Sequence, residues 1–255
     1  MTSKQRRIDG LRLAAQAVVI VVSVLTAFGL DRWWEARRSA AEERQVLIGL
    51  QVEFRDAKEL LGTNRSWHEH TETAVAQVLR QLRDARARGQ SYVSVSDTLL
   101  AWTYVPPTTG PILGTLEGLI SSGRLGILRD RELRTALASW GTVLQDLTED
   151  EVAARDYVTL HLDPTLRSRA DVTPFRIVLQ TPLPRDVVTE AEVMGKTSLP
   201  TDLETIGVLA GRLFVVGHAV EEFGPVQRHV DRILTLISKS LDRYGERAAS
   251  GAQPN

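Results

Sequence analysis

The sequence predicts a mainly α fold, in which an N-terminal transmembrane helix continues into an elongated helical bundle with at most two or three short strands. Aromatic residues make up only 5% of the 255 residues, and Leu, Val and Ala supply most of the apolar 43%, a balance that favours helices over sandwiches or barrels. An uncharged run begins at Leu13, and phased leucines follow it. We expect a short basic tail (1–12), a transmembrane helix (13–34), a helical bundle domain (35–244) and a flexible tail (245–255).

The run that begins at Leu13 is long enough to cross a bilayer. Its eighteen uncharged residues would rise roughly 27 Å as a helix, close to the ~30 Å thickness of the hydrocarbon core. Val-Val-Ile-Val-Val from Val18 is apolar on every side, whereas an amphipathic core helix would have a polar face. Trp33 and Trp34 fall where an interfacial aromatic belt belongs. A cleaved export signal is the alternative, with a small-x-small site at residues 27–29, but the run exceeds the usual signal length of about 7–15 residues.

The stretch around this run resembles a group of uncharacterised bacterial single-pass membrane proteins. "AFGLDRWWEARRSAAEERQVLIGLQVEF" is similar to their apolar helix followed by Asp/Asn-x-Trp-x-Glu and Leu-x-x-Leu-x-x-Glu, and "LISSGRLGILRDRELRTAL" is similar to a later region of the same group. The group often has a Glu early in the span, where this chain has Gln16. The resemblance implies a bacterial membrane protein and brings no established activity. The matching positions are Asp31, Trp33, Glu35, Leu47, Leu50 and Glu53.

Charged residues on the two sides of the span give its orientation. Four Lys or Arg precede it and four Arg follow closely, so the positive-inside count is nearly balanced. Asp9 is the only acid before the span, which favours an N-terminus in the cytoplasm. We therefore expect a single-pass protein of the bacterial inner (plasma) membrane with its C-terminal domain in the periplasm.

Beyond the span, apolar residues recur three and four positions apart, as in packed helices. Asn64, His68 and Thr71 continue the same phase as polar members. The pattern predicts one helix from the membrane to Arg88, ended by Gly89, with a bend or break near Gly62 and the polar middle. The phased apolar positions are Leu47, Leu50, Phe54, Ala57, Leu61, Val75, Val78 and Leu82.

The rest of the chain predicts two further long helices. One begins after the N-cap Asp130 and reaches Leu160, and a short strand is expected over 91–96. Residues 162–202 contain half of the prolines and predict an irregular excursion, with "FRIVL" as a possible strand. The closing helix should be kinked at Gly224-Pro225. Its phased residues are Ile206, Leu209, Leu213, Val216, Val220, Phe223, Val230, Leu234, Ile237 and Leu241.

The sequence lacks the residues that several kinds of binding site and reaction require. The formal net charge of −1 argues against a nucleic-acid partner, which would need a basic stripe. Without cysteine there are no disulfides, thiolate metal sites or cysteine nucleophiles. "MGKTS" around Gly195 lacks the glycine that a phosphate loop needs five residues before its Gly-Lys pair, since position 190 is Glu190. We expect no nucleotide site and no other cofactor.

Three further motifs have a plain structural interpretation. "WHEH" (67–70) could bind metal on a strand, but residues two apart point in different directions on a helix, so solvated histidines are expected. His218 and Glu222 could share a metal but are expected to form a surface or seam pair. "LISSG" lacks the spacing and the strand of a nucleophile elbow, so Ser121 and Ser122 are assigned to a helix end capped by Gly123.

Two further patterns are a run of acidic residues and a set of regularly spaced glycines. Glu149-Asp150-Glu151 is expected to be a solvated face rather than an acid–base pair. Gly110, Gly114 and Gly118 leave a smooth helix face, which outside lipid indicates tight local packing. We therefore predict no catalytic, metal or cofactor-binding residue, and no enzyme activity.

The predicted function is that of a membrane-anchored helical interaction or structural protein. Its expected partners are the lipid bilayer and either another protein or a second copy of the chain. The alternative is an extracytoplasmic domain that senses a small molecule between its helices. Such a sensor would need a separate partner for its output, because twelve residues before Leu13 are too few to fold into a signalling module.

Overall fold

A computed structural model describes residues 3–105, 108–174 and 195–250, with side chains described over 25–105, 108–174 and 195–246. The fold is mainly α, as the sequence predicts. In chain order, its elements are α1 (Ser3–Ala87), β1 (Tyr92–Ser96), α2 (Asp97–Thr103), α3 (Gly114–Ser121), the 3₁₀ turn η1 (Arg124–Ile127), α4 (Arg131–Tyr157), the π-helix η2 (Val158–Leu162), α5 (Asp163–Arg167), β2 (Lys196–Pro200) and α8 (Leu203–Ser250).

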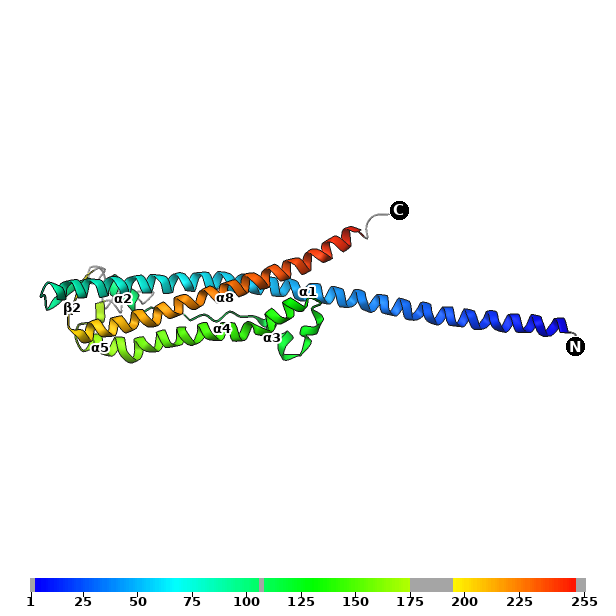
Figure 1. Ribbon diagram of the computed structural model, residues 1–255, viewed down its shortest axis with the longest axis horizontal. Coiled ribbons are helices and arrows are strands. Elements are labelled where there is room, and N and C mark those ends of the chain that lie inside the picture. The colour runs from blue at the N-terminus through cyan, green and yellow to red at the C-terminus, as the bar shows by residue number, and fades with distance from the viewer. Residues whose placement is uncertain (1–2, 106–107, 175–194, 251–255) are drawn as a thin grey trace, which may run out of the picture.

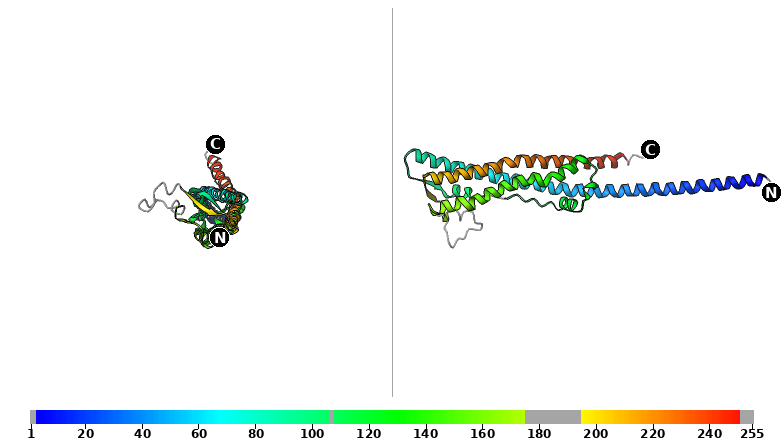
Figure 2. Two further views of the ribbon diagram at one scale, coloured as in Figure 1. Left: turned by 90° about the vertical axis from the view of Figure 1, so that its left-hand side faces the viewer. Right: turned by 60° about the horizontal axis from the view of Figure 1, so that its bottom comes forward.

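Three long helices, α1, α4 and α8, lie side by side and give the molecule its elongated shape (Figures 1 and 2). The fourth side of the bundle is filled by α2, by an extended connector over 108–113 and by α3, rather than by another long helix. The N-terminal part of α1 projects beyond the bundle, and the C-terminus of α8 lies at the same end (Figure 1).

Helix α1 follows a seven-residue pattern through the whole bundle. Its phased apolar residues are buried, and the polar Asn64, His68 and Thr71 are buried with them, so the predicted seam is confirmed. The predicted break at Gly62 is wrong, because α1 is continuous from Ser3 to Ala87. Gly89, with φ of 75°, allows the left-handed turn that follows the helix.

Helix α8 packs against both α1 and α4 and closes the bundle. Among the residues whose side chains the structure describes, which begin at residue 25, it is the one helix that is long and apolar enough, over Leu203–Glu246, to cross a membrane by length and composition. Pro225 lies inside it. The helix continues to Ser250, so the segment from 245 to 250, which we expected to be a flexible tail, is helical.

Helix α4 begins as predicted at an Asp130 cap, whose Oδ1 accepts hydrogen bonds from the backbone N–H groups of Glu132 and Leu133 at 3.0 and 3.1 Å. It ends at Tyr157, earlier than the predicted Leu160, and widens into η2. Pro164, near the start of α5, has no N–H to donate to the carbonyl four residues earlier, which interrupts the regular α ladder here.

The predicted strand over 91–96 is confirmed as β1. It pairs in antiparallel register with β2, Ser94 opposite Ser198, at the end of the bundle far from the N-terminus. Within the excursion over 162–202, the described residues thus include a short helix and a strand. The segment "FRIVL" lies outside the described residues.

Two carboxylates of α1 hold the chain around α3 in place. Glu53 accepts hydrogen bonds from the N–H groups of Thr115 and Leu116, at the N-terminus of α3, at 2.6 and 3.4 Å. Glu43, almost fully buried, accepts the N–H of Arg129 at 2.7 Å and also the hydroxyl of Tyr244. The two sequence stretches that carry the family resemblance therefore lie against each other.

The glycine spacing in this region does not produce the tight packing we expected. A Cβ placed on Gly110 or Gly118 would meet no atom within 4 Å, so these positions face open space. Close approach occurs instead at Gly49 of α1, where a Cβ would lie 3.0 Å from Thr115 Oγ1.

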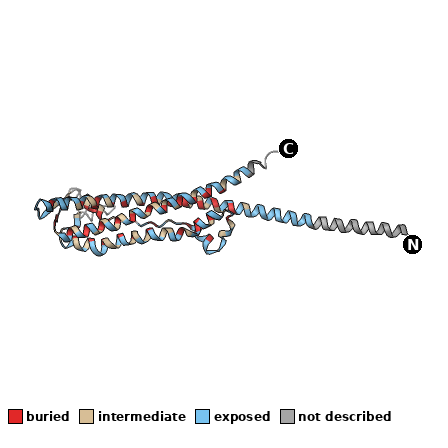
Figure 3. Ribbon diagram, in the orientation of Figure 1, coloured by how far each residue is buried: buried red, intermediate tan, exposed pale blue. Residues whose placement is uncertain are grey.

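The bundle interior contains two hydrophobic clusters, one nearer each end. Figure 3 shows buried residues along the whole length of the bundle. The cluster nearer the chain termini joins Leu47–Leu61 of α1 to Leu133–Leu147 of α4 and Phe223–Ile237 of α8. The other joins Val75–Leu82 of α1 to β1, α2, η2 and the first turns of α8. Polar side chains occupy the level between them.

Candidate functional site

The level between the hydrophobic clusters is a layer of buried polar side chains, here called the polar layer. Each of its long-helix members occupies the same seven-residue phase as the apolar core residues of its own helix. Each of these residues has less than one tenth of its surface exposed to solvent. The members are Asn64, His68 and Thr71 of α1, Glu151 of α4, Arg212 of α8 and Thr109 of the connector.

Arg212 has the largest fully buried side chain in the described chain and uses it to satisfy three backbone carbonyls. Its Nε donates to Thr103 O at 3.0 Å, Nη1 to Ala154 O at 2.7 Å and Nη2 to Val105 O at 3.3 Å. Burial lowers the pKa of Arg212 to about 10, which still leaves it protonated at neutral pH.

The carbonyls that Arg212 binds lie where regular secondary structure ends or changes. Thr103 is the last residue of α2, so its carbonyl lacks a helical donor. Ala154 lies near the end of α4, where the α-helix changes to the π-helix η2. Val105 follows α2 and also accepts the Thr71 hydroxyl at 3.0 Å. The guanidinium fork thus supplies donors at these interruptions.

Glu151 accepts hydrogen bonds from donor groups of the connector. One carboxylate oxygen accepts the N–H of Thr109 at 2.7 Å, and the other accepts the Thr109 hydroxyl at 2.7 Å. Asn64 Nδ2 donates to the same hydroxyl oxygen at 2.9 Å, and His68 Nε2 lies 3.4 Å from Glu151 Oε1.

Prolines explain why this buried layer exists. Pro106, Pro107 and Pro111 disfavour a helix, so the connector's backbone groups have no ladder of their own to join. Because an unpaired buried backbone group costs about 1–3 kcal/mol, polar side chains must meet it from the neighbouring helices. One Glu151 oxygen and three Arg212 donors are used in this way. The polar layer is therefore a structural device, and its members are buried from solvent.

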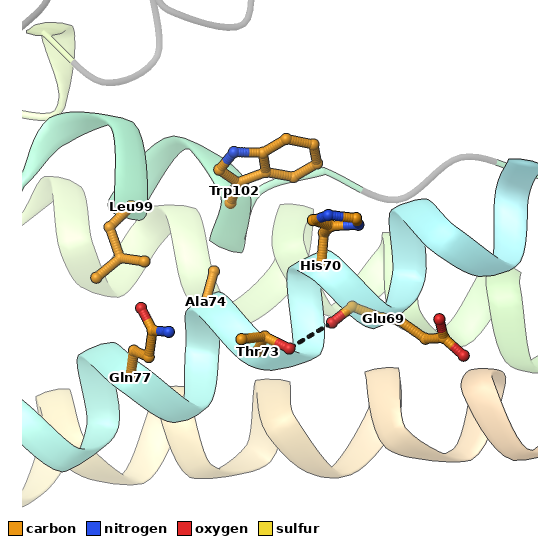
Figure 4. Close-up of a pocket in the computed structure, with 7 residues that line it drawn as sticks. All are labelled: Glu69, His70, Thr73, Ala74, Gln77, Leu99 and Trp102. Atoms are coloured by element: carbon orange, nitrogen blue, oxygen red, sulfur yellow. Dashed lines mark hydrogen bonds between the residues drawn. The ribbon is translucent and has the colours of Figure 1, made fainter.

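An accessible candidate site lies on the surface near the polar layer, between α1 and α2. It is an open pocket of about 360 Å³. Figure 4 shows Trp102 above the pocket, Leu99 and Gln77 at one end, and His70 and Glu69 at the other. It is lined by Glu69, His70, Thr73, Ala74, Gln77, Leu99 and Trp102.

Aromatic rings define one wall of this pocket. The rings of His70 and Trp102 are stacked with centroids 5.5 Å apart. Trp67, which does not line the pocket, has its ring centroid 5.2 Å from that of Trp102. One turn of α1 and the last turn of α2 thus bring three rings together, although Trp102 follows His70 by 32 positions.

The "WHEH" segment is helical, but our expectation of solvated histidines is correct only in part. His70 is exposed, whereas His68 is buried in the polar layer. The acidic run 149–151 is corrected in the same way: Glu149 is exposed, but Glu151 is fully buried. Both buried residues follow the seven-residue phase of their helices, and that phase was the available signal.

The residues of the "MGKTS" and "LISSG" motifs have structural positions. Lys196 and Thr197 of "MGKTS" lie in strand β2, where Thr197 donates to Asp97 at 2.6 Å, and not in a loop before a helix. Ser122 donates to Gly118 O at 2.5 Å, and Gly123 has φ of 67°, which confirms the predicted helix end.

His218 and Glu222 do not extend into a larger cluster. The exposed His218 packs its ring on Phe214, with centroids 4.5 Å apart. Among the described residues, no group of three or more His, Asp or Glu side chains is arranged to hold a metal ion.

No family model, no curated protein and no solved structure matches this chain. The resemblance to single-pass bacterial membrane proteins therefore stays a prediction.

Proposed function

We propose that this is a membrane-anchored helical protein that acts by binding other macromolecules on one side of the bacterial inner membrane. The N-terminal part of α1 is the anchor, and its remainder is the central helix of the binding domain. The domain lies in the periplasm, as the charge distribution of the sequence favours.

The observation that carries this proposal is the contrast between the two parts of one helix. Leu25, Phe28, Leu30 and Trp34 are 64–67% exposed, whereas the phased leucines from Leu47 onward are fully buried. Continuous large apolar surface without a partner is unfavourable in water and favourable in a bilayer. Arg37 lies over the ring of Trp33 at 4.5 Å, which suits an interfacial position.

Because α1 is continuous, a single helix joins the proposed anchor to the bundle. At about 1.5 Å per residue, its 85 residues extend about 130 Å, and no flexible linker separates the two parts. A partner would meet the domain at a fixed height above the membrane.

Proximity labelling from a ligase fused after Asn255 in intact cells tests the proposal. We expect the full chain to label inner-membrane and periplasmic proteins, and a matched chain without residues 1–34 to lose this set. Labelling of cytoplasmic proteins alone would contradict the orientation, and identical sets for both chains would contradict the role of the anchor.

The pocket between α1 and α2 favours a second candidate function, the sensing of a small molecule. It is a concave site with two aromatic rings, those of His70 and Trp102, and a few polar groups, as ligand sites commonly are. It is formed in part by α1, so a bound molecule would contact the same helix that serves as the proposed anchor.

A further inference from the structure

We infer that the pocket between α1 and α2 binds a small organic cation, an amine that carries a compact apolar group. The inference rests on the sensing candidate above and names its class of ligand. It does not depend on the membrane anchor, since every contact comes from residues 69–102.

One end of the pocket offers hydrogen-bond acceptors. His70 Nδ1 lies 2.5 Å from Ser66 O, and because a carbonyl oxygen cannot donate, the ring proton is on Nδ1. In the neutral ring Nε2 then carries a lone pair. Thr73 donates its hydroxyl proton to Glu69 O at 2.8 Å, which leaves its oxygen as an acceptor (Figure 4).

The carboxylate of Glu69 extends from the same end of the pocket, away from Trp102 and Leu99 (Figure 4). It is paired with Arg65, whose Nε donates to Glu69 Oε1 at 2.7 Å and whose Nη1 donates to Gln227 at 2.8 Å. The two charges offset each other, so the acceptors on His70 and Thr73 decide which ligand fits. An ammonium group can donate to both acceptors, whereas an anion would face their lone pairs.

The other end of the pocket is apolar. Ala74 forms its floor and Leu99 its end, while the indole of Trp102 covers it (Figure 4). Apolar carbon packs on the first two residues, and the face of Trp102 attracts a nearby cation through its quadrupole. An amine with a short apolar group matches this order of acceptors, ring and apolar surface.

The test uses two probes with the same aromatic body and opposite charge, phenethylammonium and phenylacetate. The full chain, in detergent micelles, is labelled with ¹⁵N-tryptophan, and the Trp102 indole signal is assigned from a Trp102→Phe variant. We expect phenethylammonium to shift this signal saturably below about 10 mM. Phenylacetate should give no saturable shift over the same range.

Matched variants separate the pocket from the micelle. Thr73→Val should weaken phenethylammonium binding about two- to tenfold, the range expected for the loss of one hydrogen bond. Thr63→Val, at an exposed position on the same helix, should leave it unchanged. Equal binding of both probes, no saturable shift with phenethylammonium, or equal effects of the two substitutions would each overturn the inference. Membrane retention of the same variants is measured separately, so failure here is distinct from failure of the anchor.

Discussion

Glu151 and Thr109 are joined by two hydrogen bonds, in which the backbone N–H and the hydroxyl of Thr109 each reach a different oxygen of the buried carboxylate at 2.7 Å. This pair fastens the proline-rich connector to the centre of the bundle.

Glu151→Gln should lower the free energy of unfolding by about 1–3 kcal/mol, because an amide NH₂ would replace an acceptor that faces a buried donor. Glu149→Gln, two residues away and exposed, should change it by less than about 0.5 kcal/mol. Thermal and urea unfolding followed by far-UV circular dichroism measure both. Equal effects of the two substitutions would show that burial of Glu151 is not important.

Arg212→Met should destabilise the fold by about 3–5 kcal/mol, because three buried carbonyls lose their donors together. Arg212→Lys should rescue little, since an ammonium cannot reproduce the planar fork. Arg228→Met, at an exposed position on the same helix, is the control. An Arg212→Met protein as stable as the control would contradict the role assigned to the guanidinium.

Gly211 and Gly207 should respond oppositely to substitution by alanine. A Cβ on Gly211 would overlap the hydroxyl of Tyr157, which donates to Val208 O at 3.1 Å, so Gly211→Ala should cost about 1–3 kcal/mol. A Cβ on the exposed Gly207 meets nothing within 4 Å, so Gly207→Ala should stabilise α8 by about 0.5–1 kcal/mol. Melting temperatures of the two variants give the comparison, and a shift in the same direction for both would refute it.

Asp202, just before α8, should make stability depend on pH. Burial acts to raise its pKa, but hydrogen bonds from Thr205 and the charge of Arg169 outweigh this and hold the pKa below its usual 3.8. The folded state then binds fewer protons than the unfolded state, so this stabilisation is present above about pH 4 and is lost as the pH falls through the folded pKa.

Asp202→Asn removes this contribution. The difference in free energy of unfolding between the natural chain and Asp202→Asn should be largest near neutral pH and should shrink below about pH 4. Asp242→Asn, at an exposed position on α8, is the control. A difference that is constant with pH would contradict the assignment.

The sequence predicted the long helices because their apolar phase is strong. It predicted the polar members of the α1 seam for the same reason: Asn64, His68 and Thr71 fall between leucines and valines of one phase. Arg212 and Glu151 follow equally regular phases, for example Glu151 seven residues after Leu144. For Glu151, the neighbouring acids Glu149 and Asp150 made a solvated face the simpler interpretation.

The parts that could not be predicted depend on contacts between distant segments. Nothing near Arg212 in the sequence indicates that the end of α2, the connector and the end of α4 each leave it a carbonyl. The pocket likewise requires Trp102 of α2 to stack on His70 of α1, a pairing set by how β1 and α2 fold back along α1. Local periodicity contains no information on either arrangement.

The central claim is that one helix is both membrane anchor and bundle core, and cysteine labelling tests it most directly. The natural chain has no cysteine, so Phe28→Cys and Val52→Cys each report a single position on α1. The two native side chains are similarly exposed, at 64% and 53%, so only a bilayer should distinguish them. A membrane-impermeant maleimide should label Val52→Cys from the periplasmic side, and Phe28→Cys only after the membrane is dissolved. Equal labelling of both positions in intact membranes would contradict the account.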